Sequence, residues 1–396
     1  MQTVLLAAGD GSGLEPVSSS VPKPLLPVAG EPLLQRAARR AVAGGATDLV
    51  VVVPPYYQPF TRALGETVDG VTVTYAVQPR PVGTANALVV ARRHLDDDFV
   101  VLPGDALFDV DDLASLYATV PAVGVTARAE GGDEAMIVGD GGPMDVASLS
   151  DDSAGTYVDA GACSLPGEAC EWTRVPANDD GERDIAGIVE RTADGHDVRP
   201  VHLGDYVDVD TPGDLLRANR VAFDEWADAT DDPVVEGDVD SQSRLHGAVR
   251  VESGASVATG AVVEGPAIVA ADATVGPNAY VRPYTYVGPG ATLGHSVEVR
   301  HSILLSAVHL GPHAFVADSV LAPDVDFGSG TRVANLRHDA PCVVAHDDHE
   351  RRSTDRDCIG VVAGESASTG MEATLDAGVT LERYASIDDG ATVSHD

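Results

Sequence analysis

The chain has 396 residues, of which 62 are acidic and 25 basic, and its formal net charge at pH 7 is −37. A protein this negative repels polyanions, so we expect neither a nucleic acid nor a membrane as a partner. No apolar run reaches the roughly 18 residues that a membrane span needs. Dense carboxylates repel one another unless salt screens them, and this composition is typical of a cytoplasmic protein from a salt-loving archaeon.

The N-terminal half alternates predicted strands and helices. We expect strands over residues 3–8, 49–53, 72–77 and 99–102, and helices over 32–42, 84–93 and 111–118. The segment at 49–53 is wholly apolar, which is typical of a parallel strand buried on both faces. The alternation predicts an open, Rossmann-like α/β sheet, whose ligands bind at the carboxyl ends of the strands.

The first predicted strand leads into a glycine-rich loop, and the only lysine of the chain follows it. Gly9, Gly11 and Gly13 allow backbone amides to turn toward phosphate oxygens. Lys23 stands alone among 25 basic residues, the other 24 being arginine. Because lysine is a compact point charge on a flexible stem, its presence here predicts contact with a phosphate.

Two aspartates are candidate metal ligands. Asp105 follows the strand predicted at 99–102, which places its carboxylate at the carboxyl edge of the sheet, and Asp208 precedes Thr211 and Pro212. Beside a phosphate-binding loop, such carboxylates are suitable ligands for Mg²⁺.

The C-terminal half carries a six-residue period. Aliphatic residues recur at Val251, Val257, Val263, Val269, Val275, Val281, Val287, Leu293, Val299 and Leu305, mostly followed four places later by a small residue. The period slips after Leu305, resumes at Leu310, Val316 and Ala322, and returns at Leu375, Leu381, Ile387 and Val393. This period predicts a left-handed parallel β-helix of hexapeptide repeats, with residues 335–356 as an excursion loop. We expect it to form a homotrimer.

These patterns predict two domains, an α/β domain with a candidate phosphate-binding loop over residues 1–228 and an all-β β-helix over residues 235–396. The four cysteines show no metal-type pairing, so we expect reduced thiols. They are Cys163, Cys170, Cys342 and Cys358.

Residues 5–34 resemble the signature of sugar-1-phosphate nucleotidylyltransferases. Further matching segments follow in the order of that family: Gln78 with Gly83 and Thr84, Gly104 with Asp105, Asp159 with Ala160 and Gly161, and Asp208 with Thr211 and Pro212. Joined to a β-helix, the layout is similar to archaeal bifunctional UDP-N-acetylglucosamine pyrophosphorylases with amino-sugar-1-phosphate acetyltransferase activity. The segments from Ala334 to Asp339 and from Gly360 to Gly370 look like the acetyltransferase half.

The resemblance implies roles for particular residues. A nucleotidyl group would pass from UTP or dTTP to a sugar-1-phosphate, either N-acetylglucosamine-1-phosphate or glucose-1-phosphate, and pyrophosphate would leave. The implied nucleotide site is Ala8, Gly9, Gly11, Lys23, Gln78, Gly83 and Thr84. Asp105 and Asp208 would hold Mg²⁺, with Lys23 as the third catalytic residue, and Asp159 with Gly161 would contact the sugar. Acetyl-CoA would be a second substrate only if the acetyltransferase half is active, through His309, His313 and Asn335.

The chain departs from the family pattern at several positions. Gly13 stands where the family loop has an arginine, and Asp159 stands where it has an asparagine. The Glu-Lys-Pro segment of the family has no counterpart between Met136 and Asp152. In the β-helix, Pro312 occupies the position of the histidine three residues before the aromatic Phe315. Pro341 and Val344 replace expected lysines.

Three interpretations remain open from sequence. The first is an active nucleotidylyltransferase with an oligomerising β-helix. The second is a bifunctional enzyme that also acetylates an amino-sugar-1-phosphate. The third is a degenerate, non-catalytic relative that binds sugar nucleotide or has a regulatory role by pairing with an active homologue. Retention of Lys23, Asp105 and Asp208 favours the first two, whereas the missing arginine and Glu-Lys-Pro segment favour the third.

Overall fold

The computed structural model describes residues 1–80, 83–127, 157–172, 175, 183–204, 206–230, 232–336, 344–347, 350–353 and 358–394. Its contacts divide the chain into two compact units. Unit 1 contains Met1–Asp10, Lys23–Leu25 and Pro32–Asp208, and unit 2 contains Gly11–Pro22, Leu26–Glu31 and Val209–Asp396.

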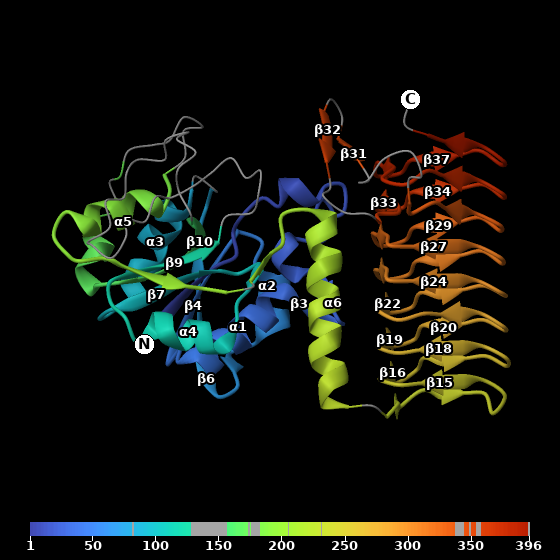
Figure 1. Ribbon diagram of the computed structural model, residues 1–396, viewed down its shortest axis with the longest axis horizontal. Helices are drawn as coiled ribbons and strands as arrows, with labels where there is room; N and C mark the ends of the chain where they lie inside the picture. The colour runs from blue at the N-terminus through green and yellow to red at the C-terminus, as the bar shows by residue number, and fades with distance from the viewer. Residues whose placement is uncertain are drawn as a thin grey trace. The chain divides into compact units, whose positions relative to one another are not determined.

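Unit 1 is built on an eight-stranded sheet (Figure 1). In spatial order its strands are β11 (Arg199–His202), β9 (Ala122–Ala127), β10 (Tyr157–Leu165), β7 (Phe99–Pro103), β1 (Gln2–Leu6), β4 (Asp48–Val53), β6 (Val71–Val77) and β5 (Thr67–Val68). The four central strands β7, β1, β4 and β6 are parallel, whereas β10 is antiparallel to β7 and β9. The four strands predicted from sequence are all present.

Helices cover both faces of this sheet. They are α1 (Leu33–Gly44), α2 (Gln58–Leu64), α3 (Thr84–Ala91), α4 (Val110–Tyr117) and α5 (Ala186–Ala193). Unit 1 also has 3₁₀ turns at Lys23–Leu25, Arg92–His94 and Gly167–Glu171. Helices α3 and α5 pack with Val4, Val50 and Val101, while α1 and α4 pack with the alternate residues Leu5 and Val51. Burial on both faces is why these strands are apolar throughout. The predicted Rossmann-like α/β fold is therefore confirmed.

Unit 2 contains three parallel eight-stranded sheets (Figure 1). The first sheet has β13 (Val234–Val235), β16 (Val249–Val251), β19 (Ala267–Val269), β22 (Thr285–Val287), β25 (Ile303–Leu304), β28 (Val320–Leu321), β33 (Val362–Ala363) and β36 (Thr380–Leu381). The second has β14 (Asp238–Val239), β17 (Ser256–Val257), β20 (Thr274–Val275), β23 (Thr292–Leu293), β26 (His309–Leu310), β29 (Asp326–Phe327), β34 (Ser368–Thr369) and β37 (Ser386–Ile387). The third has β15 (Arg244–His246), β18 (Val262–Glu264), β21 (Tyr280–Val281), β24 (Glu298–Arg300), β27 (Phe315–Ala317), β30 (Arg332–Val333), β35 (Thr374–Leu375) and β38 (Thr392–Val393). The chain visits the three sheets in turn, so each coil adds one strand to each, which is the arrangement expected of hexapeptide repeats.

The inward aliphatic column follows the predicted period from Val251 to Val299 and then differs from the prediction. Val287 pairs with Leu304, not Leu305, and Leu304 belongs to the central core of the β-helix. On the next coil Leu304 pairs with Leu321, so the predicted Ala322 also lies outside that core. The column therefore advances by five residues from Val299 to Leu304 and again from Val316 to Leu321. Sequence could not place these steps, because the adjacent residues are also apolar.

The predicted excursion interrupts the β-helix between β30 and β33. Asn335 accepts a hydrogen bond from the Ile359 N–H at 3.0 Å, and Leu336 forms an isolated bridge with Cys358, so the chain leaves and returns at one point. Between them, β31 (Val344–Asp347) pairs with β32 (Glu350–Ser353) in an antiparallel hairpin. The predicted motif residues Arg337, His338, Asp339 and Pro341 lie outside the described residues, as does the segment from Met136 to Asp152.

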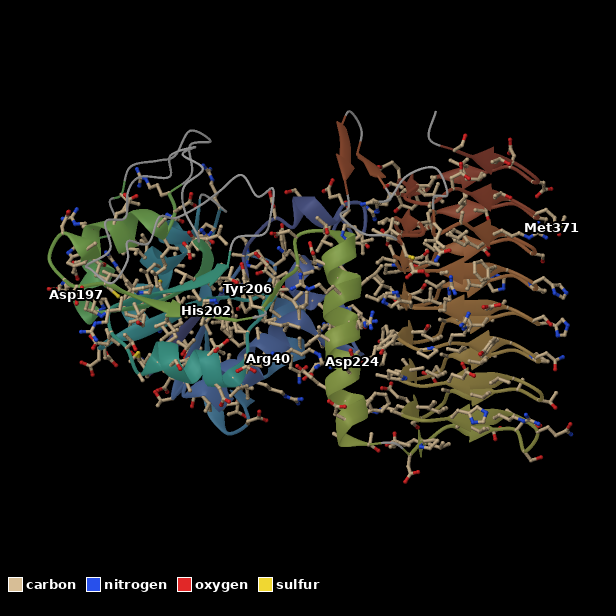
Figure 2. All side chains as sticks on the ribbon, viewed as in Figure 1. Arg40, Asp197, His202, Tyr206, Asp224 and Met371 are labelled. Carbon is tan, nitrogen blue, oxygen red and sulfur yellow. The ribbon has the colours of Figure 1, made fainter. Side chains whose placement is uncertain are left out.

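Helix α6 (Pro212–Ala229) packs within unit 2. Thr211 and Asp214 form a capping box at its start, with the Thr211 hydroxyl accepting from the Asp214 N–H at 3.2 Å. The Tyr284 hydroxyl donates to Asp224, labelled on α6 in Figure 2, at 2.8 Å. These contacts place α6 in the same compact unit as the β-helix. The predicted division into domains of residues 1–228 and 235–396 stays a prediction. Over the described residues no helix has both the length and the apolar character to cross a membrane.

The net charge predicts a strong salt dependence of stability. Carboxylates that repel one another in the compact state are screened as ionic strength rises, so we expect the melting temperature to increase steadily from dilute buffer to molar KCl. Differential scanning calorimetry across a KCl series measures this directly. Between about 0.05 and about 2 M KCl the Debye length falls roughly sixfold. An unchanged melting temperature across that range would contradict the expectation.

Candidate active site

The two candidate metal ligands belong to neighbouring strands in unit 1. Asp208 ends β12 (Val207–Asp208), which pairs antiparallel with β8 (Ala106–Leu107) so that Asp208 is opposite Ala106. Asp105 is the residue immediately before β8. Two acids separated by about a hundred residues in sequence are therefore brought to adjoining backbone positions, as the sequence analysis required of a shared metal site.

Packing behind this strand pair holds it in place. The rings of Phe108 and Tyr206 stack with centroids 5.1 Å apart and planes at 9°. The Arg40 guanidinium, on α1, donates to the Phe108 carbonyl at 2.6 Å, and Figure 2 labels both Arg40 and Tyr206. These contacts tie β8 to the segment before β12 and to α1.

The side chain of Lys23 contacts Asp105, the first of the two candidate metal ligands. Its Nζ lies 3.0 Å from Asp105 Oδ2, and the two side chains are 12% and 22% exposed. A partly buried ion pair holds the ammonium over the carboxylate that is expected to bind metal. The one lysine of the chain and the first predicted ligand are therefore brought together.

The two carboxylates would bind Mg²⁺ together with phosphate oxygens of the substrate. In the parts of the chain that the structure describes, no cluster of three or more His, Cys, Asp or Glu residues is placed to hold a metal. Two carboxylates fit Mg²⁺, which is usually bound by one or two carboxylates together with substrate phosphate oxygens and water. Asp105 and Asp208 fit that requirement.

The described residues predicted to read the base are joined by hydrogen bonds to one another or to neighbouring segments. Gln78 follows β6 and is buried, and its Nε2 donates to the Gly83 carbonyl at 3.3 Å and to Asn86 Oδ1 at 3.2 Å. Gly83 has φ +99°, and a Cβ there would come within 2.3 Å of the Arg183 carbonyl oxygen, so only glycine fits. The Thr84 hydroxyl accepts from the Ile185 N–H at 2.8 Å. Gln78, Gly83 and Thr84 thus form one connected element.

The parallel strands β1 and β7 end side by side, so the loops that follow them begin at the same end of the sheet. Leu6 of β1 is in register with Pro103 of β7, and the Gly104 N–H donates to the Leu6 carbonyl at 2.8 Å. Ala8 and Gly9 therefore follow β1 at the edge where Asp105 follows β7. Gly11 is in unit 2, where it precedes the 3₁₀ turn Ser12–Leu14 with φ +75°.

Gly13 has a structural reason for lacking a side chain. A Cβ at Gly13 would lie 2.3 Å from the Asp210 carbonyl oxygen, and both residues belong to unit 2. The arginine that the resemblance places here would require the backbone to move. The observed packing of the loop thus fits glycine at this position.

Asp159 and Gly161, the predicted sugar contacts, form a local turn in β10. Asp159 Oδ1 accepts from the Gly161 N–H at 2.8 Å, beside an irregularity in the pairing of β10 with β9. Burial raises the pKa of the Asp159 carboxyl from 3.8 to about 6, and the Gly161 hydrogen bond opposes that shift.

The raised pKa predicts a pH-dependent gain from Asp159→Asn. Asparagine keeps the acceptor for Gly161 but cannot ionise. Since folding raises the pKa, ionisation destabilises the native state; the cost begins near pH 4, grows until about pH 6, and is constant above. We expect the variant to be more stable than wild type by about 2–3 kcal/mol at pH 8 and about half as much at pH 5.

Thermal unfolding at both pH values in molar KCl measures this difference. The exposed Asp48→Asn variant is the control for loss of one negative charge. An equal change in melting temperature at pH 5 and pH 8 would show that Asp159 does not titrate between them.

The histidines predicted for acetyl transfer have separate neighbours. His309, on β26, places Nδ1 at 2.7 Å from Asp326 Oδ1, with both side chains largely exposed. The His313 ring packs edge-on against His295 with centroids 5.3 Å apart. Asn335 instead donates from Nδ2 to Asp318 Oδ2 at 2.6 Å and is buried.

His301 and Asp318, which no sequence pattern singled out, form one hydrogen-bonded cluster with Asn335. His301 Nδ1 is hydrogen-bonded to Asp318 Oδ1, and Asp318 is in turn bonded to Asn335. The three residues are each 17 positions apart, which is the length of a coil that contains one five-residue step. That spacing is the signal that could have identified them, but the six-residue period obscured it.

Comparison with known proteins gives matches in both halves. A model described as nucleotidyl transferase matches residues 2–125, and one described as GMPPB C-terminal domain matches residues 263–354. The bifunctional protein GlmU of Methanocaldococcus jannaschii is 27% identical over 387 residues, covering 96% of this chain and 92% of the relative. The bifunctional protein GlmU of Methanococcus maripaludis strain C7 is 30% identical over 387 residues, with the same coverage of both chains.

A third archaeal relative also aligns along its whole length. The bifunctional sugar-1-phosphate nucleotidylyltransferase/acetyltransferase of Sulfurisphaera tokodaii is 26% identical over 402 residues, covering 100% of this chain and 98% of the relative. The matched nucleotidyl transferase region contains Lys23, Gln78 and Asp105. Together with the sheet, the connected element at Gln78 and the β-helix, these matches show that the chain belongs to the family of archaeal bifunctional GlmU proteins and is a nucleotidyltransferase.

Proposed function

We propose that the chain transfers a nucleotidyl group from UTP or dTTP to a sugar-1-phosphate, and that Asp105 and Asp208 hold the required Mg²⁺. The observation that carries this proposal is the meeting of Lys23 with Asp105 at 3.0 Å, beside the strand that ends at Asp208. The names of the bifunctional relatives support a sugar-1-phosphate as acceptor.

The proposed reaction needs no covalent enzyme intermediate. An oxygen of the sugar-1-phosphate attacks the α-phosphorus of the triphosphate, and the bond from that phosphorus to the leaving pyrophosphate breaks. Charge develops on the oxygens around phosphorus, and bound Mg²⁺ would neutralise part of it. Lys23 contributes a second positive charge at the same place, so a strongly acidic protein can still bind a polyanion at short range.

The remaining residues position the substrates. The rigid element formed by Gln78, Gly83 and Thr84 would present amide groups to the nucleotide base, and Gly9 would offer its backbone amide to the triphosphate. Asp159 and Gly161 would contact the sugar. Because the loop around Gly13 has no arginine, Lys23 and the metal would carry the leaving-group charge that an arginine would otherwise share.

Pyrophosphate release tests the proposal. The assay uses UTP or dTTP with N-acetylglucosamine-1-phosphate or glucose-1-phosphate, in molar KCl with Mg²⁺. Release that requires both substrates and is abolished by chelator is the expected result. Nucleotide binding without pyrophosphate release from any pair would instead favour the non-catalytic alternative.

A second activity, acetylation of an amino-sugar-1-phosphate by acetyl-CoA, is supported by the β-helix. Two observations favour it: the alignment of the whole chain with a relative named as an acetyltransferase, and the buried cluster at Asn335. We also propose that the β-helix forms a homotrimer, which sedimentation velocity of the full chain in molar KCl would test. A monomer at micromolar concentration would contradict the trimer.

A further inference from the structure

We propose that His301 is the general base for acyl transfer in the β-helix, oriented by Asp318 and Asn335. This inference depends on the proposed second activity. It does not depend on the nucleotidyl-transfer site, whose residues are in unit 1.

The cluster is built into one corner of the β-helix, where the chain passes from the third sheet to the first. His301 and Asp318 both have left-handed backbone conformations, with φ +46° and +50°. Their N–H groups donate to the carbonyls of Pro283 and Arg300 on the coil before, at 3.1 and 3.2 Å. The two five-residue steps of the inward column fall at this corner, so the same local geometry recurs on consecutive coils and stacks the side chains.

Hydrogen bonding determines which nitrogen of His301 is available. Both carboxylate oxygens of Asp318 are used, Oδ1 by His301 Nδ1 and Oδ2 by Asn335 Nδ2 at 2.6 Å. The side chain of Asp318 is only 8% exposed. An ionised carboxylate accepts and does not donate, so Nδ1 of a neutral His301 carries the proton and Nε2 has the free electron pair.

The fold leaves Nε2 of His301 without a hydrogen bond. The atom is buried and has no hydrogen-bond partner among the described residues, which is also true of several other side-chain atoms, Arg300 Nε and Thr285 Oγ1 among them. Burying a polar atom without a partner costs free energy, and a catalytic role is one explanation for such an atom. The edge of Tyr284, with ring centroids 5.8 Å apart, limits movement of the imidazole. A nitrogen held still, shielded from water and unpartnered is arranged to accept a proton from a bound substrate.

His309 shares the carboxylate contact but lacks the other features. It pairs with Asp326, yet the two side chains are 48% and 66% exposed, so water competes for both nitrogens. His313 packs on another histidine ring. Of the three imidazoles, His301 has the arrangement expected of a base: an orienting carboxylate, burial and a free nitrogen.

The step balances as an aminolysis of an acyl thioester. His301 Nε2 takes a proton from the attacking amine of the amino-sugar phosphate as the new C–N bond forms. The C–S bond breaks, and the electron pair leaves with sulfur. The proton then passes from Nε2 to the thiolate, so an amide and a free thiol are the products and His301 returns to its neutral form.

Chemical rescue of His301→Gly separates this role from a structural one. Glycine suits the left-handed backbone at this position and leaves space that added imidazole can occupy. With acetyl-CoA and glucosamine-1-phosphate, thiol release measures the reaction. We expect kcat to fall by about 10²-fold or more, as general-base removal typically does. We expect KM to change little, and imidazole to restore activity in His301→Gly only.

The comparisons use His301→Gln, the exposed His246→Gln as control, and His309→Gln and His313→Gln as rival bases. Pyrophosphate release and the melting temperature report the state of the rest of the chain. If wild type releases no thiol, the proposed second activity and the role of His301 both fail, while nucleotidyl transfer is judged separately. If wild type is active and His301→Gln keeps its kcat, or if His301→Gly is folded but not rescued by imidazole, only the role of His301 is overturned.

Discussion

Replacement of Asp208 by asparagine is expected to reduce pyrophosphate release by about 10²–10³-fold while the protein stays folded. Asparagine preserves the shape of the side chain but removes the negative charge that would hold the metal in the proposed site. The developing charge on phosphorus is then poorly neutralised, and loss of one such electrostatic contribution typically costs 10²–10³ in kcat. Because Asp208 ends a short strand paired with β8 through backbone hydrogen bonds, the isosteric change leaves that pairing intact.

Asp105→Asn should be at least as damaging, for an additional reason. Asp105 also holds Lys23 at 3.0 Å, so its neutralisation releases the ammonium from its position. We therefore expect Asp105→Asn to weaken binding of the nucleotide as well as turnover. Asp208→Asn should affect mainly turnover and the concentration of Mg²⁺ required.

The exposed Asp48→Asn variant is the matched control, since it removes one carboxylate of unit 1 at the amino end of β4, away from the carboxyl ends of the strands. Turnover against Mg²⁺ concentration, calorimetric titration with nucleotide and the melting temperature in molar KCl complete the comparison. Activity of Asp208→Asn within threefold of wild type, a difference of less than about 1 kcal/mol, would remove the carboxylate from the metal site. So would full wild-type turnover in excess chelator.

Lys23→Ala is expected to weaken binding of the triphosphate by about 1.5–3 kcal/mol, the usual contribution of a hydrogen bond to a charged group. This corresponds to roughly 10- to 150-fold in the dissociation constant. The side chain is only 12% exposed, so water cannot easily take its place beside Asp105. The Asp105 carboxylate is then left without its cation next to an incoming polyanion, which adds repulsion.

Lys23→Arg tests whether positive charge alone is sufficient. Arginine carries the same charge in a larger, planar group, so it cannot reproduce the point contact of the compact lysine ammonium. We expect it to recover only part of the affinity and less of the turnover. Calorimetry with UTP and dTTP measures the binding, and pyrophosphate release measures the rate. Unchanged affinity in both variants would place Lys23 outside the nucleotide site.

The packing around Gly13 leaves no room for the arginine that the family loop has at this position. With the Asp210 carbonyl 2.3 Å from where a Cβ would be, any side chain at this position displaces the backbone. The loop is thus adapted to glycine. In the proposed site, Lys23 and the metal would supply the neutralisation that would otherwise come from an arginine, so we expect large effects from changing Lys23 or the metal ligands.

Several features of this protein follow from sequence alone because they arise from short-range patterns. The apolar run from Leu49 to Val53 could only be a strand buried on both faces, and the helices alternating with it implied the parallel sheet. The six-residue period from Val251 to Val299 specified the β-helix, since no helix or simple strand repeats at that spacing. Lys23 and Asp105 stood out by residue type and by position after a strand.

Other features were decided by tertiary contacts that local patterns do not encode. Leu304 and Leu305 are both apolar and buried, so only the pairing of Leu304 with Val287 shows which one enters the central core. A five-residue step in place of six is what aligns His301, Asp318 and Asn335 on successive coils. The contact of Lys23 with Asp105 and the close approach of Gly13 to Asp210 likewise join segments far apart in the chain. The hydrophobic pattern of the sequence indicates which residues are buried. Strand register and long-range packing decide which buried residues contact each other, because shifting a strand by one residue between apolar neighbours changes every contact but leaves the hydrophobic pattern nearly the same.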